Sequence, residues 1–324
     1  MPQVALWGKG ILCKKSAENT NYTTHVWLHR LSSTEIAPAH ISCGFEDYQG
    51  DTLDFHKDVV NSKRNTADDM NKKNRLAALL PTSRKAFADY DAKFSKNSLR
   101  GLKTISLIEQ EKEDFIELYN FHSPIYTHLF NQLTTSENGI DNSLCPYCTI
   151  GEASNLDHIV PKTIMPVFSD NPKNLIPCCS NCNSKKSNTW LADGNWDYIN
   201  LYLDDIPTEQ YLFVELSIEN NTIRVKFYLD DSNSIDKDLY LKISNHYKKL
   251  DLCRRFEQYS FHEISETAIL IKQFSKLLGN DKCKEIILAT SLELQKRFGS
   301  NYWKAILRKE CCMNDSIFQL LKNK

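Results

Sequence analysis

Two matched cysteine pairs constrain how this chain can fold more than any other feature of its sequence. Each pair has the form Cys-x-x-Cys and 30 residues separate them: Cys145 with Cys148, and Cys179 with Cys182. A tetrahedral zinc site needs four soft ligands about 2.3 Å from the metal, and one tight turn can supply two of them. The pairs therefore predict a structural Zn²⁺ site, whose binding energy would contribute to folding. Four unrelated buried thiols are the alternative interpretation.

The composition limits the class of protein. With 324 residues and a formal net charge of −1, the chain is not uniformly basic, so any nucleic-acid-binding surface must be local. No run of 18 apolar residues occurs, which predicts no membrane-spanning helix. The N-terminus lacks the pattern of a signal peptide, so we expect a cytoplasmic protein whose paired cysteines bind metal. Cys178 does not have the two-residue spacing to Cys182 and is expected to be a free, packed cysteine.

Residue patterning predicts an α+β fold in three parts. They are an N-terminal mixed α/β region over 1–140, a small metal-binding module over 141–206, and a hairpin with a mostly helical region over 207–324. Within the first part, β-branched and aromatic residues predict strands, and apolar periodicity predicts helices. The predicted strands are 3–8 and 22–30, and the helices are 66–80, 82–95 and 110–134, the last bent or split at Pro124 before a loop at 136–143.

The third part begins with a hairpin pattern. Two alternating runs span 211–230 and meet at Glu219, Asn220 and Asn221, and asparagine tolerates the positive φ that such turns need. From about residue 236 to the end the pattern is helical, with breaks at Gly279 and Gly299.

A basic excess lies in the N-terminal part. Residues 57–103 contain twelve Lys and Arg against five Asp, which leaves a charge of +7. Such an excess on helices could steer a polyanion to the protein. Ordinary solvated helix faces are the alternative.

Two adjacent residues between the cysteine pairs offer the chemistry of phosphodiester hydrolysis. This reaction needs a base for the attacking water, charge stabilisation at phosphorus and help for the departing oxygen, and one divalent cation can supply the last two. The carboxylate of Asp157 is a hard ligand for such a cation, and the imidazole of His158 can act as a general base. Neighbouring residues of a strand point to opposite faces, so both can serve one site only where the strand twists, bulges or ends.

The whole ordered set of motifs resembles a known family. Cys-x-x-Cys, Asp-His-Ile-x-Pro, Asn, Cys-x-x-Cys-Asn and Lys follow one another over about 45 residues, as in the cysteine-bearing form of the HNH, or ββα-metal, endonucleases. The resemblance implies that Asp157 and Asn183 hold the catalytic metal and that His158 is the general base. It also implies that Asn174 steadies the loop and helps to orient His158. Many relatives carry a second histidine where this chain has Asn183; a neutral amide is a weaker ligand for transition metals, so we expect Mg²⁺ or Mn²⁺ there.

Lysines near these motifs are candidates for phosphate binding. Lys185 and Lys186 follow Asn183, and Lys186 matches a lysine that is frequent in the family. Lys162 could also touch the nucleic-acid backbone. The alternative for each is a solvated position.

A structural metal and a catalytic metal predict different effects for substitutions at the two sites. Replacing Cys145 or Cys182 should unfold or aggregate the module. By contrast, Asp157→Ala should abolish cleavage with little loss of thermal stability.

A weaker resemblance concerns biological role. Residues 168–177, 190–191 and 202–207 resemble HNH proteins of bacterial anti-phage systems, notably Septu and the effector nucleases of some retrons. It implies a DNA endonuclease that acts as a defence effector. RNA such as tRNA as substrate, or a zinc-stabilised nucleic-acid-binding or scaffold protein without catalysis, are the alternatives. No G-x-x-x-x-G-K-[ST] loop occurs, so a regulatory ATPase or other defence subunit would be a separate chain.

Overall fold

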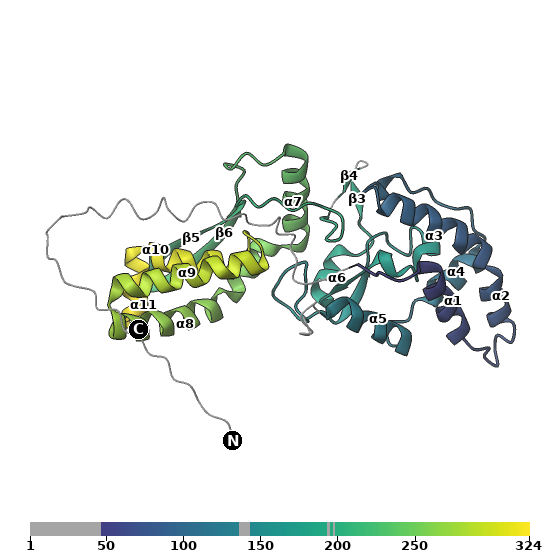
Figure 1. The fold of residues 1–324 in the computed structure, drawn as a ribbon, viewed down its shortest axis with the longest axis horizontal. Helices are drawn as coiled ribbons and strands as arrows, with labels where there is room; N and C mark the ends of the chain where they lie inside the picture. The colour runs from purple at the N-terminus through teal and green to yellow at the C-terminus, as the bar shows by residue number, and fades with distance from the viewer. Residues whose placement is uncertain (1–46, 136–142, 193–194, 197) are drawn as a thin grey trace, which may run out of the picture. The chain divides into compact units, whose positions relative to one another are not determined.

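The computed structural model describes residues 47–135, 143–192, 195–196 and 198–324. The elements below all belong to the unit Pro38–Lys324. The strands predicted at 3–8 and 22–30, and all but the end of the loop at 136–143, lie outside the described residues. The fold is α+β and mostly helical, as the patterning predicts, with a ββα module between two groups of helices (Figure 1).

Among the described residues, α-helices dominate the chain before the module and run from purple through blue to teal in Figure 1. Pro124 begins a new helix, because the first helical position needs no N–H donor, so the predicted segment 110–134 is split and not bent. The α-helices of this part are α1 (Thr52–Ser62), α2 (Lys72–Ala78), α3 (Leu80–Phe94), α4 (Glu109–Leu118) and α5 (Pro124–Thr134).

The helix predicted over 66–80 begins only at Lys72. Before it, Thr66 and Asp69 form an isolated β-bridge, and the carboxylate of Asp69 accepts a hydrogen bond of 2.7 Å from Arg75. The same guanidinium also binds Asp114 of α4, at 2.9 Å. This contact between helices favours a turn at Asp69, which local apolar periodicity does not reveal.

The module is a hairpin followed by a helix. Strand β1 (Asn155–His158) pairs antiparallel with β2 (Leu175–Cys178), and α6 (Ser180–Lys186) begins directly after β2. Both strands are almost wholly buried, because α5 packs against β2 and α6 packs against β1. That loop contains the short 3₁₀ helices η2 (Pro166–Phe168) and η3 (Pro172–Asn174). Strand β1 ends at His158. Asp157 and His158 therefore lie at a strand end, which is one of the places where two neighbouring residues can serve the same site.

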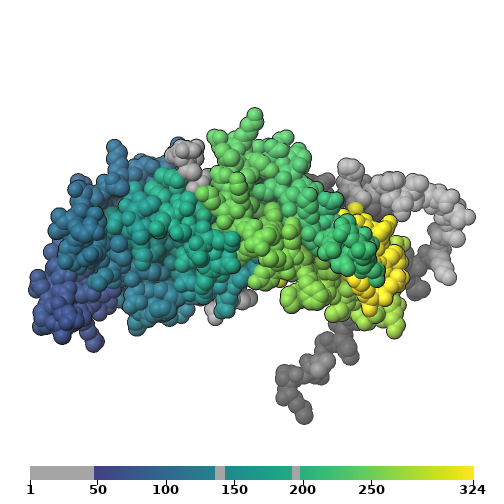
Figure 2. All heavy atoms as spheres, turned by 180° about the vertical axis from the view of Figure 1, so that it is seen from behind, coloured from purple at the N-terminus to yellow at the C-terminus, as the bar shows by residue number. Residues whose placement is uncertain are grey.

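Aromatic side chains join the module to the preceding helices. Phe168 of η2 packs against Tyr90 and Phe87 of α3, with ring centroids 5.0 and 6.4 Å apart. In the space-filling view the teal surface of the module lies beside the blue surface of these helices (Figure 2). The loop between β1 and β2 is therefore seated on α3 instead of projecting into solvent.

The remaining chain confirms the predicted hairpin and helices. Asn220 and Asn221 take φ values of 48° and 63°, the left-handed conformation that a tight hairpin turn requires. Gly279 and Gly299, with φ of 84° and 96°, separate three of the helices as predicted. The elements are β3 (Leu191–Ala192), β4 (Asn195–Trp196), β5 (Leu212–Glu219), β6 (Thr222–Leu229), α7 (Lys237–Leu250), α8 (Leu252–Leu278), α9 (Asn280–Phe298), α10 (Trp303–Met313) and α11 (Asp315–Asn323).

None of the helices among the described residues is both long enough and apolar enough to cross a membrane.

Candidate active site and metal centre

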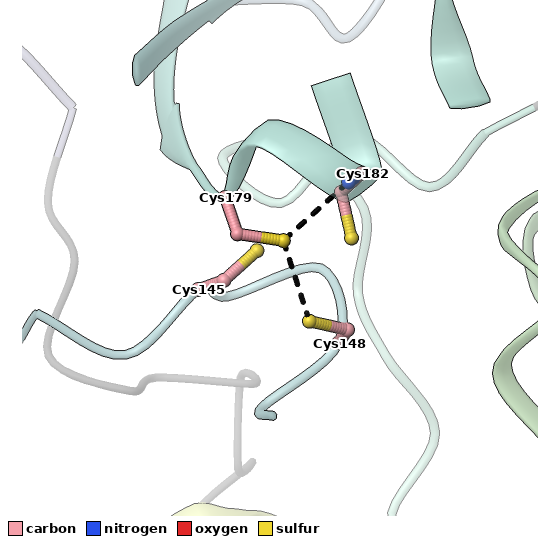
Figure 3. A group of neighbouring side chains, drawn as sticks. All are labelled: Cys145, Cys148, Cys179 and Cys182. Carbon is pink, nitrogen blue, oxygen red and sulfur yellow. Dashed lines mark hydrogen bonds between the residues drawn. The ribbon is translucent and has the colours of Figure 1, made fainter. Parts of the chain in front are cut away.

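The four paired cysteines come together in one buried cluster. Their Sγ atoms all lie within 4.8 Å of one another, and those of Cys148 and Cys179 are 3.9 Å apart (Figure 3). Four sulfurs about 2.3 Å from one tetrahedral ion would be ~3.8 Å apart, so the cluster has the size of a zinc site. Cys179 is the N-cap of α6, and its Sγ accepts a bond from the backbone N–H of Cys182 at 3.4 Å. The donor set and its burial fit a structural zinc.

The cluster favours the charged form of two of its thiols. Hydrogen bonding from Cys145 lowers the pKa of Cys148 to about 6 and also lowers the pKa of Cys179, whereas hydrogen bonds with the other thiols raise the pKa of Cys145 and of Cys182. Thiolates are the form that binds zinc. Cys178, by contrast, lies outside the cluster, and burial raises its pKa, as expected of a packed, neutral thiol.

A buried arginine from α8 reaches the cluster. Arg255 donates from Nη1 to the Sγ of Cys182 at 3.2 Å, and its Nη2 lies 4.0 Å from the Sγ of Cys179. Four thiolates around one zinc carry excess negative charge, so a buried guanidinium beside them offsets that charge and orients two ligands. The helical C-terminal region is thus part of the metal centre.

Asp157 lies in β1 and is held from two sides. Its Oδ2 accepts a hydrogen bond from the hydroxyl of Tyr147 at 2.9 Å, and the ammonium of Lys186 lies 3.1 Å from the same oxygen. Burial raises the pKa of the Asp157 carboxyl, and the charge of Lys186 offsets part of that effect. Tyr147 belongs to the first cysteine pair, so the zinc knuckle directly fixes the orientation of this carboxylate.

The position of Lys186 differs from that of a surface phosphate ligand. Its side chain is 3% exposed, and its ammonium lies 2.6 Å from the backbone oxygen of His158. It also faces the ring of Tyr198, 5.8 Å from the centroid. Lys186 therefore neutralises Asp157 and holds the end of β1, a role different from the phosphate contact that the sequence predicts.

His158 is oriented by a backbone carbonyl. Its Nε2 lies 2.9 Å from the oxygen of Ser169, which can only accept, so Nε2 carries the proton. The neutral ring then has its lone pair on Nδ1, the atom available to take a proton. The ring of Tyr119 packs edge-on against His158, with centroids 4.6 Å apart. Burial lowers the pKa of His158 to about 3, so the ring is neutral at ordinary pH.

Asn174 is fully buried and joins both ends of the loop between the strands. Its side chain accepts from the N–H of Val160 at 2.8 Å, and it donates to the oxygens of Val160 and Phe168, each at 3.0 Å. Phe168 directly precedes Ser169, whose carbonyl holds His158. Asn174 thus reaches His158 through the loop and not by direct contact.

The other candidate residues are partly open to solvent. Asn183 stands on α6 one turn before Lys186, on the helix face that meets Asp157. The ammonium of Lys162 lies over the ring of Tyr119, 4.8 Å from its centroid, and half-burial lowers its pKa. Lys185 is exposed, and its ammonium lies 3.9 Å from the carboxylate of Asp251.

The predicted basic excess is partly neutralised within the fold. Several of its side chains form ion pairs with nearby carboxylates, which reduces the charge left to attract a polyanion. The pairs are Lys57 with Asp54, Lys72 with Glu117, Arg75 with Asp69 and Asp114, and Lys93 with Asp89.

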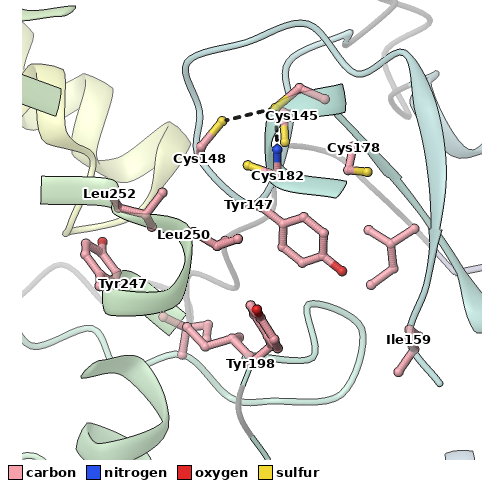
Figure 4. Packing of buried hydrophobic residues seen from close by; sticks show 14 of the residues in the cluster. Cys145, Tyr147, Cys148, Ile159, Cys178, Cys182, Tyr198, Tyr247, Leu250 and Leu252 are labelled. Carbon is pink, nitrogen blue, oxygen red and sulfur yellow. Dashed lines mark hydrogen bonds between the residues drawn. The ribbon is translucent and has the colours of Figure 1, made fainter. Parts of the chain in front are cut away.

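Sequence reasoning missed two residues of this site. Tyr147 had a local signal, because it lies inside a zinc knuckle where an aromatic hydroxyl must find a polar partner once buried. Arg255 had none, since it is 73 residues beyond Cys182 in a helix of ordinary composition. Tyr147 packs in one hydrophobic cluster with Tyr198, Leu250 and Leu252, and the two leucines lie at the junction of α7 and α8 (Figure 4).

Comparison with known proteins agrees with this geometry. The HNH endonuclease family matches residues 145–189. Protein ea31 of Escherichia phage lambda is 25% identical over 231 residues, covering 66% of this chain and 74% of that protein. No solved structure matches the chain. Residues 145–189 are therefore an HNH endonuclease domain, built as a ββα module with a buried four-cysteine cluster, in a chain distantly related to protein ea31.

Proposed function

We propose that the chain is a metal-dependent endonuclease that hydrolyses phosphodiester bonds in DNA. The observation that carries this proposal is the environment of His158 beside a buried carboxylate. Its Nε2 is committed to the Ser169 carbonyl at 2.9 Å, which leaves the Nδ1 lone pair for a proton. That pairing of base and carboxylate lies within the segment that matches the HNH family.

In this proposal His158 removes a proton from the attacking water through Nδ1. The imidazole accepts the proton as the oxygen–phosphorus bond forms, and a positioned base of this kind contributes about 10²- to 10⁴-fold to rate. The low pKa of about 3 in the free protein means that the base is already deprotonated when substrate arrives. Tyr119 and the Ser169 carbonyl keep the ring from turning.

Asp157 and Asn183 would hold the catalytic Mg²⁺ or Mn²⁺. Their oxygens are the hard donors that these cations prefer. The Asp157 carboxylate also accepts hydrogen bonds from Tyr147, Lys186 and the backbone N–H of His158, which fix its orientation. When bound, the cation would stabilise charge at phosphorus and at the departing oxygen.

Phosphate contact is assigned to the half-buried Lys162 and the exposed Lys185. Lys162 lies close enough to His158 to depress its pKa, and Lys185 is on the exposed face of α6. Both can neutralise phosphates that flank the scissile bond. Lys186 acts instead through Asp157.

A role in conflict between bacteria and phages follows as a further part of the proposal. The resemblance of residues 168–177, 190–191 and 202–207 to HNH proteins of anti-phage systems supports a defence effector, whose activity a separate subunit such as an ATPase would control. The related protein ea31 is encoded by a phage.

The test is cleavage of supercoiled plasmid and of transfer RNA by purified zinc-loaded protein, with and without Mg²⁺. We expect Mg²⁺-dependent nicking of the plasmid, lost in Asp157→Asn, a substitution that keeps the size and one oxygen of the side chain. Degradation of RNA with intact plasmid would replace DNA by RNA as substrate. Intact DNA and RNA with Mg²⁺ and with Mn²⁺ would refute a nuclease and favour a binding or scaffold protein.

A further inference from the structure

His56 of helix α1 forms a buried polar pair with Asp170, which lies in the loop that holds His158. Nδ1 of His56 lies 2.6 Å from Oδ2 of Asp170, and both side chains are 0% exposed. The two residues are 114 positions apart in the sequence, so the fold, and not local structure, brings them together. His56 also packs edge-on against Phe87, with ring centroids 5.5 Å apart, which fixes the plane of its ring.

Asp170 is coupled to His158 through one peptide unit. The carbonyl of Ser169 accepts the hydrogen bond from Nε2 of His158, and this carbonyl belongs to the planar group that joins Ser169 to Asp170. Because the six atoms of that group move together, holding Asp170 limits the directions in which the Ser169 oxygen can point. The orientation of that oxygen decides which ring nitrogen of His158 carries the proton.

The bond between the pair is the side-chain anchor of Asp170. Within the described residues, Oδ1 of Asp170 and Nε2 of His56 have no protein partner. Other bonds of this segment are local: the hydroxyl of Ser169 donates to the oxygen of Pro166 at 2.6 Å, and Oδ1 of Asn171 accepts from the N–H of Lys173. His56 thus ties the side chain of Asp170 to helix α1 by a hydrogen bond.

We propose that His56 and Asp170 are positioning residues for His158, acting through the Ser169 carbonyl to keep its Nε2 protonated and its Nδ1 free. The inference rests on the proposed function only in giving His158 a catalytic role; the tautomer itself is a property of the protein without substrate. A merely structural pair would change stability and leave the tautomer of His158 as it is.

The experiment measures that tautomer by ¹⁵N NMR of histidine-labelled, zinc-loaded protein without Mg²⁺, with the His158 signals identified by their loss in His158→Gln. The wild type should show a protonated Nε2 and an unprotonated Nδ1. In His56→Phe, which keeps an aromatic ring against Phe87 but removes the bond to Asp170, a mixture of both tautomers should appear. Asp170→Asn keeps an acceptor for His56 and should retain the wild-type tautomer. Val59→Ala, a buried substitution on the same helix, controls for general loss of stability.

Two results would overturn the proposal. One is an unchanged His158 tautomer in folded His56→Phe. The other needs no variant: a wild-type His158 with its proton on Nδ1 would contradict the inferred geometry even if His56→Phe failed to fold. Plasmid cleavage separates this proposal from the proposed function, since kcat should fall on the order of 10²-fold in His56→Phe with KM little changed. Absence of cleavage in the wild type would refute the nuclease and leave the tautomer result to decide the positioning role.

Discussion

Arg255 offers a quantitative test of the zinc centre, because it touches the ligands without being one. Replacing it with methionine keeps much of the buried volume and removes the bond of 3.2 Å to the Sγ of Cys182. Arg255 is only 6% exposed, so solvent would not replace the lost charge. A hydrogen bond to a charged group contributes about 1.5–3 kcal/mol. Loss of a partner around a metal site costs 10- to 100-fold in affinity, about 1.4–2.8 kcal/mol. Both routes give a loss of about 2 kcal/mol, or on the order of 30-fold in zinc affinity.

The assay is competition for zinc between the protein and a chromophoric chelator at fixed pH, with thermal melting in parallel. Arg254→Met is the matched control, since Arg254 is 58% exposed and pairs with Asp251 at the surface. That variant should bind zinc as the wild type does, because exposed ion pairs contribute little. Arg255→Lys, which keeps a charge but not the planar group, should fall between the two. Wild-type zinc affinity in Arg255→Met would refute the argument that α8 completes the metal centre.

Three further predictions concern buried polar groups. Asn174→Ala leaves the N–H of Val160 and two carbonyl oxygens without their hydrogen-bond partner, so the free energy of unfolding measured in denaturant should fall by about 3 kcal/mol or more. A fall under about 1 kcal/mol would contradict the role of Asn174 in holding the loop. Burial lowers the pKa of His246 to about 4, so the unfolded chain binds more protons between about pH 6.5 and 4. Stability is therefore lost as pH falls through that window, by up to about 1.4 kcal/mol per pH unit, and His246→Phe should flatten the denaturation profile there. The acid limb of kcat/KM should lie well below pH 6.5, because burial lowers the pKa of His158; a limb near pH 6.5 would indicate an exposed base.

Much of the fold could be predicted where local chemistry decides it. The turn at Asn220 and Asn221, the breaks at Gly279 and Gly299 and the helix start at Pro124 each follow from the backbone preference of one residue type. The late start of α2 could not, because Arg75 joins Asp69 to Asp114 across 45 residues. Contacts between distant segments override local periodicity there.

In the candidate site, too, local sequence predicts some features, and contacts between distant segments decide the others. The cysteine spacing predicts a cluster that the structure contains, since each tight turn brings two thiols together. The environment of Asp157 could not be foreseen, because its partners Tyr147 and Lys186 converge only in the folded module. The structure also changes the expected effect of Asp157→Ala. The substitution to alanine would leave the buried ammonium of Lys186 without a counter-charge, which costs about 3–5 kcal/mol, so we expect a large loss of stability. Asp157→Asn also removes the charge opposite Lys186, but its amide oxygen can still accept from Lys186 and Tyr147, so we expect a smaller loss of stability and use this variant to separate chemistry from folding.

The most direct test of the account is Mg²⁺-dependent plasmid cleavage by His158→Gln. Glutamine can still donate to the Ser169 carbonyl from the place of Nε2 but offers no basic nitrogen at the place of Nδ1. Zinc content and melting temperature should match the wild type, while the cleavage rate should fall by about 10²- to 10⁴-fold. Cleavage at the wild-type rate by folded, zinc-loaded His158→Gln would contradict the assignment of His158 as the base and with it the proposed mechanism.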